Sequence, residues 1–178
     1  TGAPALGNWA NYHDLDLVFR SDVVQNRFIA DVMREMVIVE SKRRLHEGGK
    51  SWLIRFYNDY GALMCCFFGY KNTADAPIQT LAMESIEENI QVRGIVADAS
   101  HALYVPTIVY LHDTKATQIN RKKLNIRLPD DMPLVIYHTG SRGEFNVGDV
   151  IWAHGGLVEM VVSGKRYQAV VVVEREGA

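Results

Sequence analysis

The run Ala169–Val173, which reads AVVVV, is the feature that most restricts how this chain can fold. It contains four consecutive valines and no charge, and β-branched residues favour strands. Left as an open sheet edge, such a run would pair with other chains and aggregate. We therefore expect a strand that lies between two others or under a covering element. Val170 and Val172 should face one way, Val171 and Val173 the other, with both faces largely buried.

The stretch around this run predicts further strands. From Phe145 to Glu174 the sequence has three apolar segments, separated by turn signals at His154–Gly156 and Ser163–Arg166. Segments of Val, Ile and aromatic residues broken by glycine are typical of consecutive antiparallel strands. The pattern thus predicts three strands at this end of the chain.

Strand signals also occur upstream. Residues 51–57 and 62–70 flank the turn sequence Asn-Asp-Tyr-Gly and predict a hairpin. The second of these runs carries no charge, which favours a central position with both faces covered. Other strands are expected at residues 13–19, 91–97, 103–111, 124–128 and 134–137. Loops are expected at residues 112–123 and 139–144.

Two amphipathic helices are predicted. The first begins at Ser21 and has one broad apolar stripe, made of a row that recurs every four residues (Val24, Phe28, Val32 and Met36) and an adjoining row (Ile29, Met33 and Val37). It runs either to Leu45 or only to about Met36, because the β-branched residues 37–39 weaken a helix. The second begins at Pro77 and continues to residue 90.

These elements define an α+β fold: an antiparallel β-sandwich or barrel of about eight strands, with a jelly-roll as one arrangement and two helices in the N-terminal half. With 178 residues, 48% of them hydrophobic and 22% charged, the chain is expected to form a single domain over residues 1–178.

Charge argues against a surface devoted to nucleic acid, because the net charge is −2. Two local basic clusters remain, and each is explained either as a phosphate contact or as ordinary solvent-exposed charge. If the fold brings them together, they predict a nucleic-acid contact surface. Their members are Lys42, Arg43 and Arg44, and Arg121, Lys122 and Lys123.

Residues 1–11 are small and polar and predict an extended N-terminal arm. Trp9 and Tyr12 lie within or just after it. These aromatic side chains either pin the arm to its own domain or reach a neighbouring subunit, since an ordered terminus needs a partner.

No motif predicts a catalytic, metal-binding or cofactor-binding residue. The two cysteines, Cys65 and Cys66, are adjacent in an apolar strand, and the six histidines do not have metal-site spacing. Residues 139–143, TGSRG, lack the phosphate-loop pattern and predict a connection between strands. No apolar stretch approaches the ~20 residues of a membrane span, and no signal peptide is expected.

Two functions fit this sequence. The first is a non-enzymatic structural subunit in a capsid-like, virion-associated or scaffold role, in the cytoplasm or a virion. Its expected partners are copies of itself, with other structural proteins as an alternative. The second is a small barrel that acts as an enzyme or ligand-binding module, with polar groups such as His101, His112, Asp113 or His138 at one mouth, or that binds nucleic acid through a basic patch.

Overall fold

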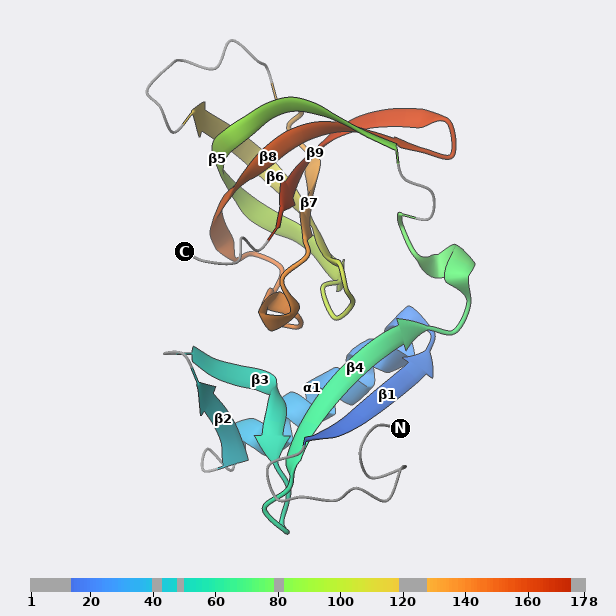
Figure 1. Cartoon of the computed structure of the whole chain (residues 1–178), viewed down its shortest axis with the longest axis vertical. Helices are drawn as coiled ribbons and strands as arrows, with labels where there is room; N and C mark the ends of the chain where they lie inside the picture. Colours follow the sequence, from blue (N-terminus) through green and yellow to red (C-terminus); the bar gives the residue numbers. More distant parts are fainter. Residues whose placement is uncertain (1–13, 40–42, 48–49, 79–81, 119–127, 174–178) are drawn as a thin grey trace. The chain divides into compact units, whose positions relative to one another are not determined.

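The chain forms two compact units. The computed structural model describes residues 14–39, 43–47, 50–78, 82–118 and 128–173. Contacts group into an N-terminal unit, Thr1–Asp75, and a C-terminal unit, Ala76–Ala178. Each unit has a β-sheet of its own (Figure 1). Chain length alone predicted one domain over residues 1–178, whereas the contacts divide the chain after Asp75.

The N-terminal unit contains a four-stranded sheet in the order β1-β4-β3-β2. The β3–β4 hairpin occupies the two central positions, as predicted, and β1 runs parallel to β4. Asn58 closes the hairpin, because its side-chain oxygen accepts hydrogen bonds from the backbone N–H groups of Tyr60 and Ala62. The strands are β1 (Leu15–Ser21), β2 (Arg44–Glu47), β3 (Lys50–Tyr57) and β4 (Leu63–Tyr70).

Helix α1 (Val23–Val39) connects β1 to β2. Its N-cap is Asp22, whose carboxylate accepts a hydrogen bond from the backbone N–H of Gln25 at 2.8 Å. Two ends were predicted for this helix, Met36 and Leu45. The observed end at Val39 is closer to Met36. No helix among the residues described is both long and apolar enough to cross a membrane.

Only part of the predicted stripe of α1 packs, namely the row of Ile29, Met33 and Val37, of which Val37 is buried. The row Val24, Phe28, Val32 and Met36 is 41–79% exposed. The buried face carries Asn26, Ala30 and Val37 instead.

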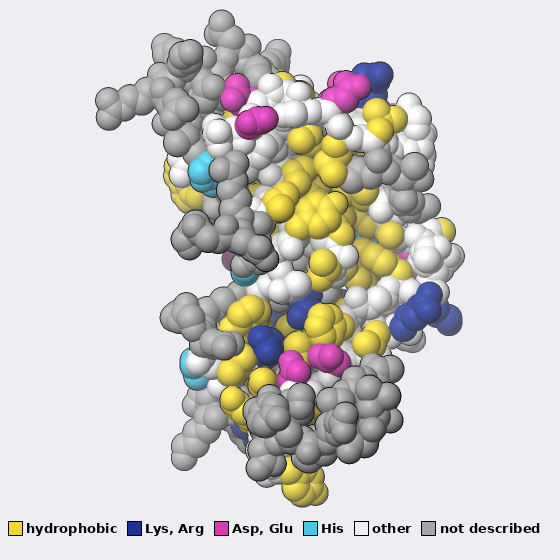
Figure 2. All heavy atoms as spheres, viewed as in Figure 1, with side chains coloured by type: hydrophobic (Ala, Val, Ile, Leu, Met, Phe, Trp, Pro, Cys, Tyr) yellow, Lys and Arg dark blue, Asp and Glu magenta, His cyan; other side chains and the backbone are white. Residues whose placement is uncertain are grey.

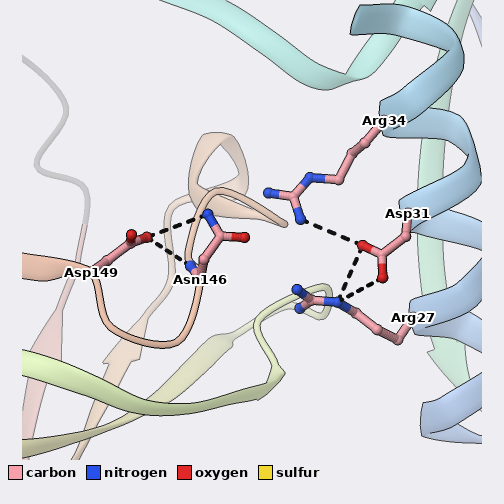
Figure 3. A network of polar contacts seen from close by, with 5 residues as sticks. All are labelled: Arg27, Asp31, Arg34, Asn146 and Asp149. Atoms are coloured by element: carbon pink, nitrogen blue, oxygen red, sulfur yellow. Dashed lines mark hydrogen bonds and ion pairs between the residues drawn. The ribbon is translucent and has the colours of Figure 1, made fainter.

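Polar bonding explains why this face is buried. The Asn26 amide donates to the carbonyl oxygens of Ser21 and Gly69, at 3.1 and 2.9 Å, and so ties the helix to β4. The small side chain of Ala30 lets the helix lie close to the sheet of the N-terminal unit. Outside the buried face, Asp31 forms ion pairs with Arg27 at 3.3 Å and Arg34 at 3.6 Å (Figure 3).

The C-terminal unit is a closed barrel of five strands in the order β5-β6-β7-β9-β8. In it β8 lies beside β5, and β5, β6 and β7 follow one another, which is the order of a Greek key. Strand β9 closes the barrel between β7 and β8, parallel to β7 and antiparallel to β8. The strands are β5 (Ala82–His101), β6 (Thr107–Gln118), β7 (Met132–Ile136), β8 (Val150–Val162) and β9 (Lys165–Val172) (Figure 1).

The predicted fold class is therefore right in being β-rich. A barrel was one predicted alternative, but the barrel has five strands rather than about eight, and two further details differ. Two strand pairs, β1–β4 and β7–β9, are parallel rather than antiparallel. The second predicted helix is absent from the described part of residues 77–90, where β5 begins at Ala82 and pairs with β8. The apolar residues at 78, 82, 86 and 90 are four apart, and an even spacing fits one face of a strand as well as one face of a helix.

Strand lengths also differ from the prediction. The stretch 145–174 holds two strands rather than three, because Gly155 and Gly156 lie inside β8 and form no turn. The second turn is confirmed: Ser163 and Gly164 both have positive φ, as a tight two-residue hairpin turn requires. Strand β6 continues to Gln118 through residues predicted as a loop. The strand predicted at 124–128 lies outside the described residues except for Leu128.

Two apolar layers surround β9. Inside the barrel, Val170 packs with Val109, Leu134 and Leu157. Outside it, Val171 packs with Ile108, Val135, Met160 and Ala169, and Ile78 adds to this outer layer. The predicted burial of both faces of the valine run is confirmed for residues 170–172. It is wrong for Val173, which is 63% exposed because it follows the last paired residue of β9.

The backbones of β8 and β9 approach each other closely at Gly155, next to the start of their ladder at Gly156. A Cβ atom there would lie 2.3 Å from the backbone oxygen of Val171, which is far inside van der Waals contact. At the neighbouring Gly156 the nearest atom would be 3.7 Å away, an ordinary contact.

We predict that Gly155→Ala lowers the free energy of unfolding by about 2 kcal/mol or more, because backbone atoms must move apart. Gly156→Ala is the matched control and should change it by less than about 1 kcal/mol. Urea unfolding of the whole chain measures both values. Equal effects of the two substitutions would contradict this account of the close approach.

Candidate binding face of the barrel

The outer face of β6, β5 and β8 carries a row of three directly paired residues. Arg93 on β5 lies opposite Lys115 on β6 and opposite Trp152 on β8. Directly opposite residues in antiparallel strands project from the same face with Cβ atoms roughly 5 Å apart. The row therefore places two cations and one indole side by side on the barrel wall. Below, Lys115, Arg93 and Trp152 are called the outer row.

The side chains of the outer row are open to solvent to different degrees. Trp152 is 62% exposed, which is high for the largest side chain in the protein. The Lys115 side chain is 70% exposed, and Arg93 is half-buried between its neighbours. Exposed Gln91 and His154, which are paired with each other, lie one step along the same face.

A bulge in β6 helps to set this arrangement. Three steps along β6, from His112 to Lys115, span the distance that two steps cover on β5, and Asp113 has a φ of +50°. The bulge brings Lys115 to the outer face. The Asp113 carboxylate lies 3.7 Å from the Lys115 ammonium, so part of the local positive charge is already neutralised.

The start of β8 is held by a local turn. The Asp149 carboxylate accepts a hydrogen bond from the backbone N–H of Asn146 at 2.7 Å (Figure 3). The Asp149 carbonyl in turn accepts one from the backbone N–H of Val96 on β5 at 2.9 Å. These bonds fix the strand three residues before Trp152.

Two clefts flank β8 beside the outer row, and both are lined by His154. Strand β8 pairs with β9 only from Gly156 onward, whereas residues 150–155 pair with β5 alone. One cleft, of about 550 Å³, lies where β8 diverges from β9, and Trp152 borders it. The other, of about 680 Å³, lies at the glycine pair and has Ser85, Glu88 and Asn89 in its wall.

The outer face of β6 and β7 is covered by apolar side chains. Ile108 and Val135 are buried there, and Tyr110 packs against them. Burial raises the pKa of Tyr110, and the negative charge of Asp98, which pairs with it across the strands, adds to that rise. Figure 2 shows hydrophobic side chains gathered on the visible face of the barrel. The buried apolar side chains leave little of the outer face of β6 and β7 accessible to a ligand.

The residues predicted as a basic contact surface are only partly described. Arg43 forms an ion pair with Asp59, and Arg44 lies half-buried at the start of β2. Lys42, Arg121, Lys122 and Lys123 lie outside the described residues, so the proximity of the two clusters stays a prediction. Trp9, Tyr12 and the rest of residues 1–11 lie outside them as well.

Other predicted polar groups have separate places. The loop 139–143 connects β7 to β8, and buried Arg142 donates to the carbonyl of Thr139 at 3.0 Å, a structural role. His138 lines the 550 Å³ cleft, whereas His112 and Asp113 lie on the outer face of β6. His101 lies beside Tyr104 with the two rings tilted and their centroids 6.2 Å apart. Of these four residues, only His138 lines this cleft.

Metal-ligand types come together at one place among the residues described. The side-chain donor atoms of Asp14, Asp16 and Cys65 lie within 4.8 Å of one another. A guanidinium nitrogen of Arg55 lies 3.4 Å from the Asp14 carboxylate and already compensates its charge. Both cysteines are buried, on opposite faces of β4. We assign no metal or nucleophile here.

Sequence reasoning missed the outer row. Arg93 and Trp152 are isolated in the sequence, and only strand register brings them together with Lys115. The one available signal was a tryptophan at an alternating position in a predicted strand, which is equally typical of a core residue. Comparisons with known protein families, characterised proteins and solved structures find no match to this chain, so the residues themselves carry the functional argument.

The pKa of Tyr110 provides a test of its burial on the outer face of β6 and of its pairing with Asp98. The neutral phenol is favoured in the fold, so its contribution to stability is complete below the ordinary pKa of 10.0 and is lost as pH rises through the higher folded value. Asp98→Asn removes a negative charge and should move the Tyr110 titration to lower pH. An NMR titration of the Tyr110 ring measures this shift, and an unchanged midpoint would contradict the pairing.

Proposed function

We propose that the C-terminal unit binds single-stranded nucleic acid on the outer face of β6, β5 and β8. The observation that carries this proposal is the outer row, in which an exposed indole stands directly beside Arg93, with Lys115 on the next strand beyond it. An exposed tryptophan is costly to leave in water and is a good stacking platform. The neighbouring cations suit the phosphates between stacked bases.

The physical basis is common to proteins that bind single strands. Each base that stacks on an aromatic side chain contributes about 1–3 kcal/mol, and every base has a face that can stack. Arginine adds a planar cation that contacts both phosphates and rings. A duplex hides its base faces, so the outer row should favour single strands.

The charge of the chain predicts that electrostatic attraction of a nucleic acid is limited to the outer row and adds little affinity. The whole chain has a net charge of −2, which gives no long-range attraction for a polyanion. Two cations, one of them beside Asp113, neutralise few phosphates. Stacking should therefore supply more of the affinity than charge does.

The architecture agrees with this proposal without establishing it. Five-stranded Greek-key barrels include the OB-fold, whose members bind oligonucleotides or oligosaccharides on the barrel side. OB-folds use the face of their second and third strands, which correspond to β6 and β7 here. In this chain that face is covered by the outer apolar layer, and the outer row lies on the adjoining side. A shared fold alone does not assign a function.

Trp152→Ala should weaken binding of a fluorescent oligothymidylate by roughly 5- to 100-fold, as loss of one stacking platform predicts. Tyr60→Ala is the matched control, because it removes an exposed aromatic ring from a turn of the N-terminal unit. Fluorescence anisotropy measures both affinities.

Salt dependence separates the stacking role from the charge role. Arg93→Ala should reduce the slope of log affinity against log salt by about 0.7, whereas Trp152→Ala should leave the slope unchanged. Failure of the wild-type chain to bind, or full affinity in Trp152→Ala, would contradict the proposed function.

The assembly function stays a second proposal, and one observation favours it. The exposed row Val24, Phe28, Val32 and Met36 gives α1 an uncovered apolar stripe. A soluble chain gains by burying such a stripe against another surface.

A second copy of this chain is the partner we propose for the stripe. The stripe is apolar and self-complementary, so a two-fold axis would bury the stripe of one copy against that of the other. Such pairing is consistent with a structural subunit of a capsid-like, virion-associated or scaffold assembly, in the cytoplasm or a virion.

Phe28→Glu should lower the molar mass of the particle in solution, because it puts a charge in the centre of the stripe. Size-exclusion chromatography with light scattering measures this mass at matched concentrations. Tyr60→Glu, which charges an exposed aromatic outside the helix, should leave it unchanged. A monomeric wild-type chain would contradict self-assembly through α1.

A further inference from the structure

The cleft of about 550 Å³ beside the outer row has the composition of a slot for a flat ring. Its floor is the apolar interior of the barrel, which is reached where β8 diverges from β9 and includes Ile151 and Val172. Phe145 adds an aromatic ring. Both Trp152 and Phe145 therefore border the same opening, one on the exposed face and one towards the core.

Polar groups lie among these apolar side chains. His138 and Ser141 come from the β7–β8 connection, and the Ser141 hydroxyl lies 3.4 Å from Nδ1 of His138. His154 lines the cleft from β8. Imidazole and hydroxyl groups both donate and accept hydrogen bonds, as the edge of a nucleobase does.

This combination selects the class of ligand. A phosphate or a free sugar would lose its hydration against the apolar floor without a charged partner, which is costly. An aromatic heterocycle fits, because its faces are apolar and its edges are polar. The volume lies within the range of about 300–1,000 Å³ typical of small-ligand sites.

We propose that this cleft holds one unstacked base of the single strand that lies on the outer row. This inference rests on the proposed nucleic-acid function and specifies how a base is held. The neighbouring base stacks on Trp152, and the inserted base lies over Ile151 and Val172 with its edge towards His138 and Ser141. Proteins that bind single strands commonly hold splayed bases between aromatic side chains in this way.

Filling the cleft tests the proposal. Ser141→Phe places a ring inside it and leaves the outer row intact, whereas Thr139→Phe adds the same ring at an exposed position that does not line the cleft. Ser141→Phe should weaken binding of an oligothymidylate by roughly five- to tenfold, the loss of one base contact. It should leave binding of an abasic oligodeoxynucleotide of equal length unchanged. Thr139→Phe should change neither affinity.

A measurement on the wild-type chain covers the case in which Ser141→Phe fails to fold. Photocrosslinking with an oligonucleotide that carries 5-iodouracil, followed by peptide mass spectrometry, should label Phe145 or His138 as well as Trp152. Labelling of Trp152 alone would overturn the proposal, as would full oligothymidylate affinity in a folded Ser141→Phe chain.

The two proposals fail in different ways. If the wild-type chain does not bind the oligothymidylate, the proposed function is wrong, and the base slot is wrong with it. If the wild-type chain binds and depends on Trp152 but not on the cleft, only the base slot is wrong.

Discussion

The close approach of β8 to β9 at Gly155 is the contact on which the barrel depends. No side chain fits between this residue and the Val171 carbonyl, so the two strands meet backbone to backbone. Beyond this contact, β8 leaves β9 and pairs with β5 alone. The same divergence opens the cleft between β8 and β9 and places Trp152 at its border. The β8–β9 ladder from Gly156 to Val162 closes the barrel, and its end at Gly155 borders the feature that we propose as a base slot.

The barrel has two kinds of outer surface, and this difference directs the functional proposal. The side formed by β6, β7 and β9 is covered by a second apolar layer, in which Val135 and Val171 are buried. The side formed by β6, β5 and β8 leaves Trp152 and Lys115 exposed, with half-buried Arg93 between them. Because covered apolar groups stabilise the fold and uncovered ones are available for contact, the ligand is expected on the second side.

Much of the strand content could be predicted from local pattern, and the errors have identifiable causes. The β3–β4 hairpin and the tight turn at Ser163–Gly164 were predicted correctly because turn residues and alternating apolar runs act locally. The stretch 82–90 was predicted as helix because spacing by four fits both structures, and pairing with β8 decided between them. The packing face of α1 was predicted too broadly because apolar residues form two rows on the helix, and Asn26, which hydrogen-bonds to Gly69, lies on the buried side with Val37.

The sequence by itself determined that this chain is rich in strands, and that the valine run had to be enclosed, because an uncharged β-branched segment is not stable as an open edge. Tertiary structure alone decided what encloses it, namely β7 and β8, and alone assembled the candidate site. Lys115, Arg93 and Trp152 come from three strands far apart in the sequence, so only the register of the barrel places them in one row. Local pattern records which way a side chain points along its own strand, but it holds no information about which residue of another strand lies opposite.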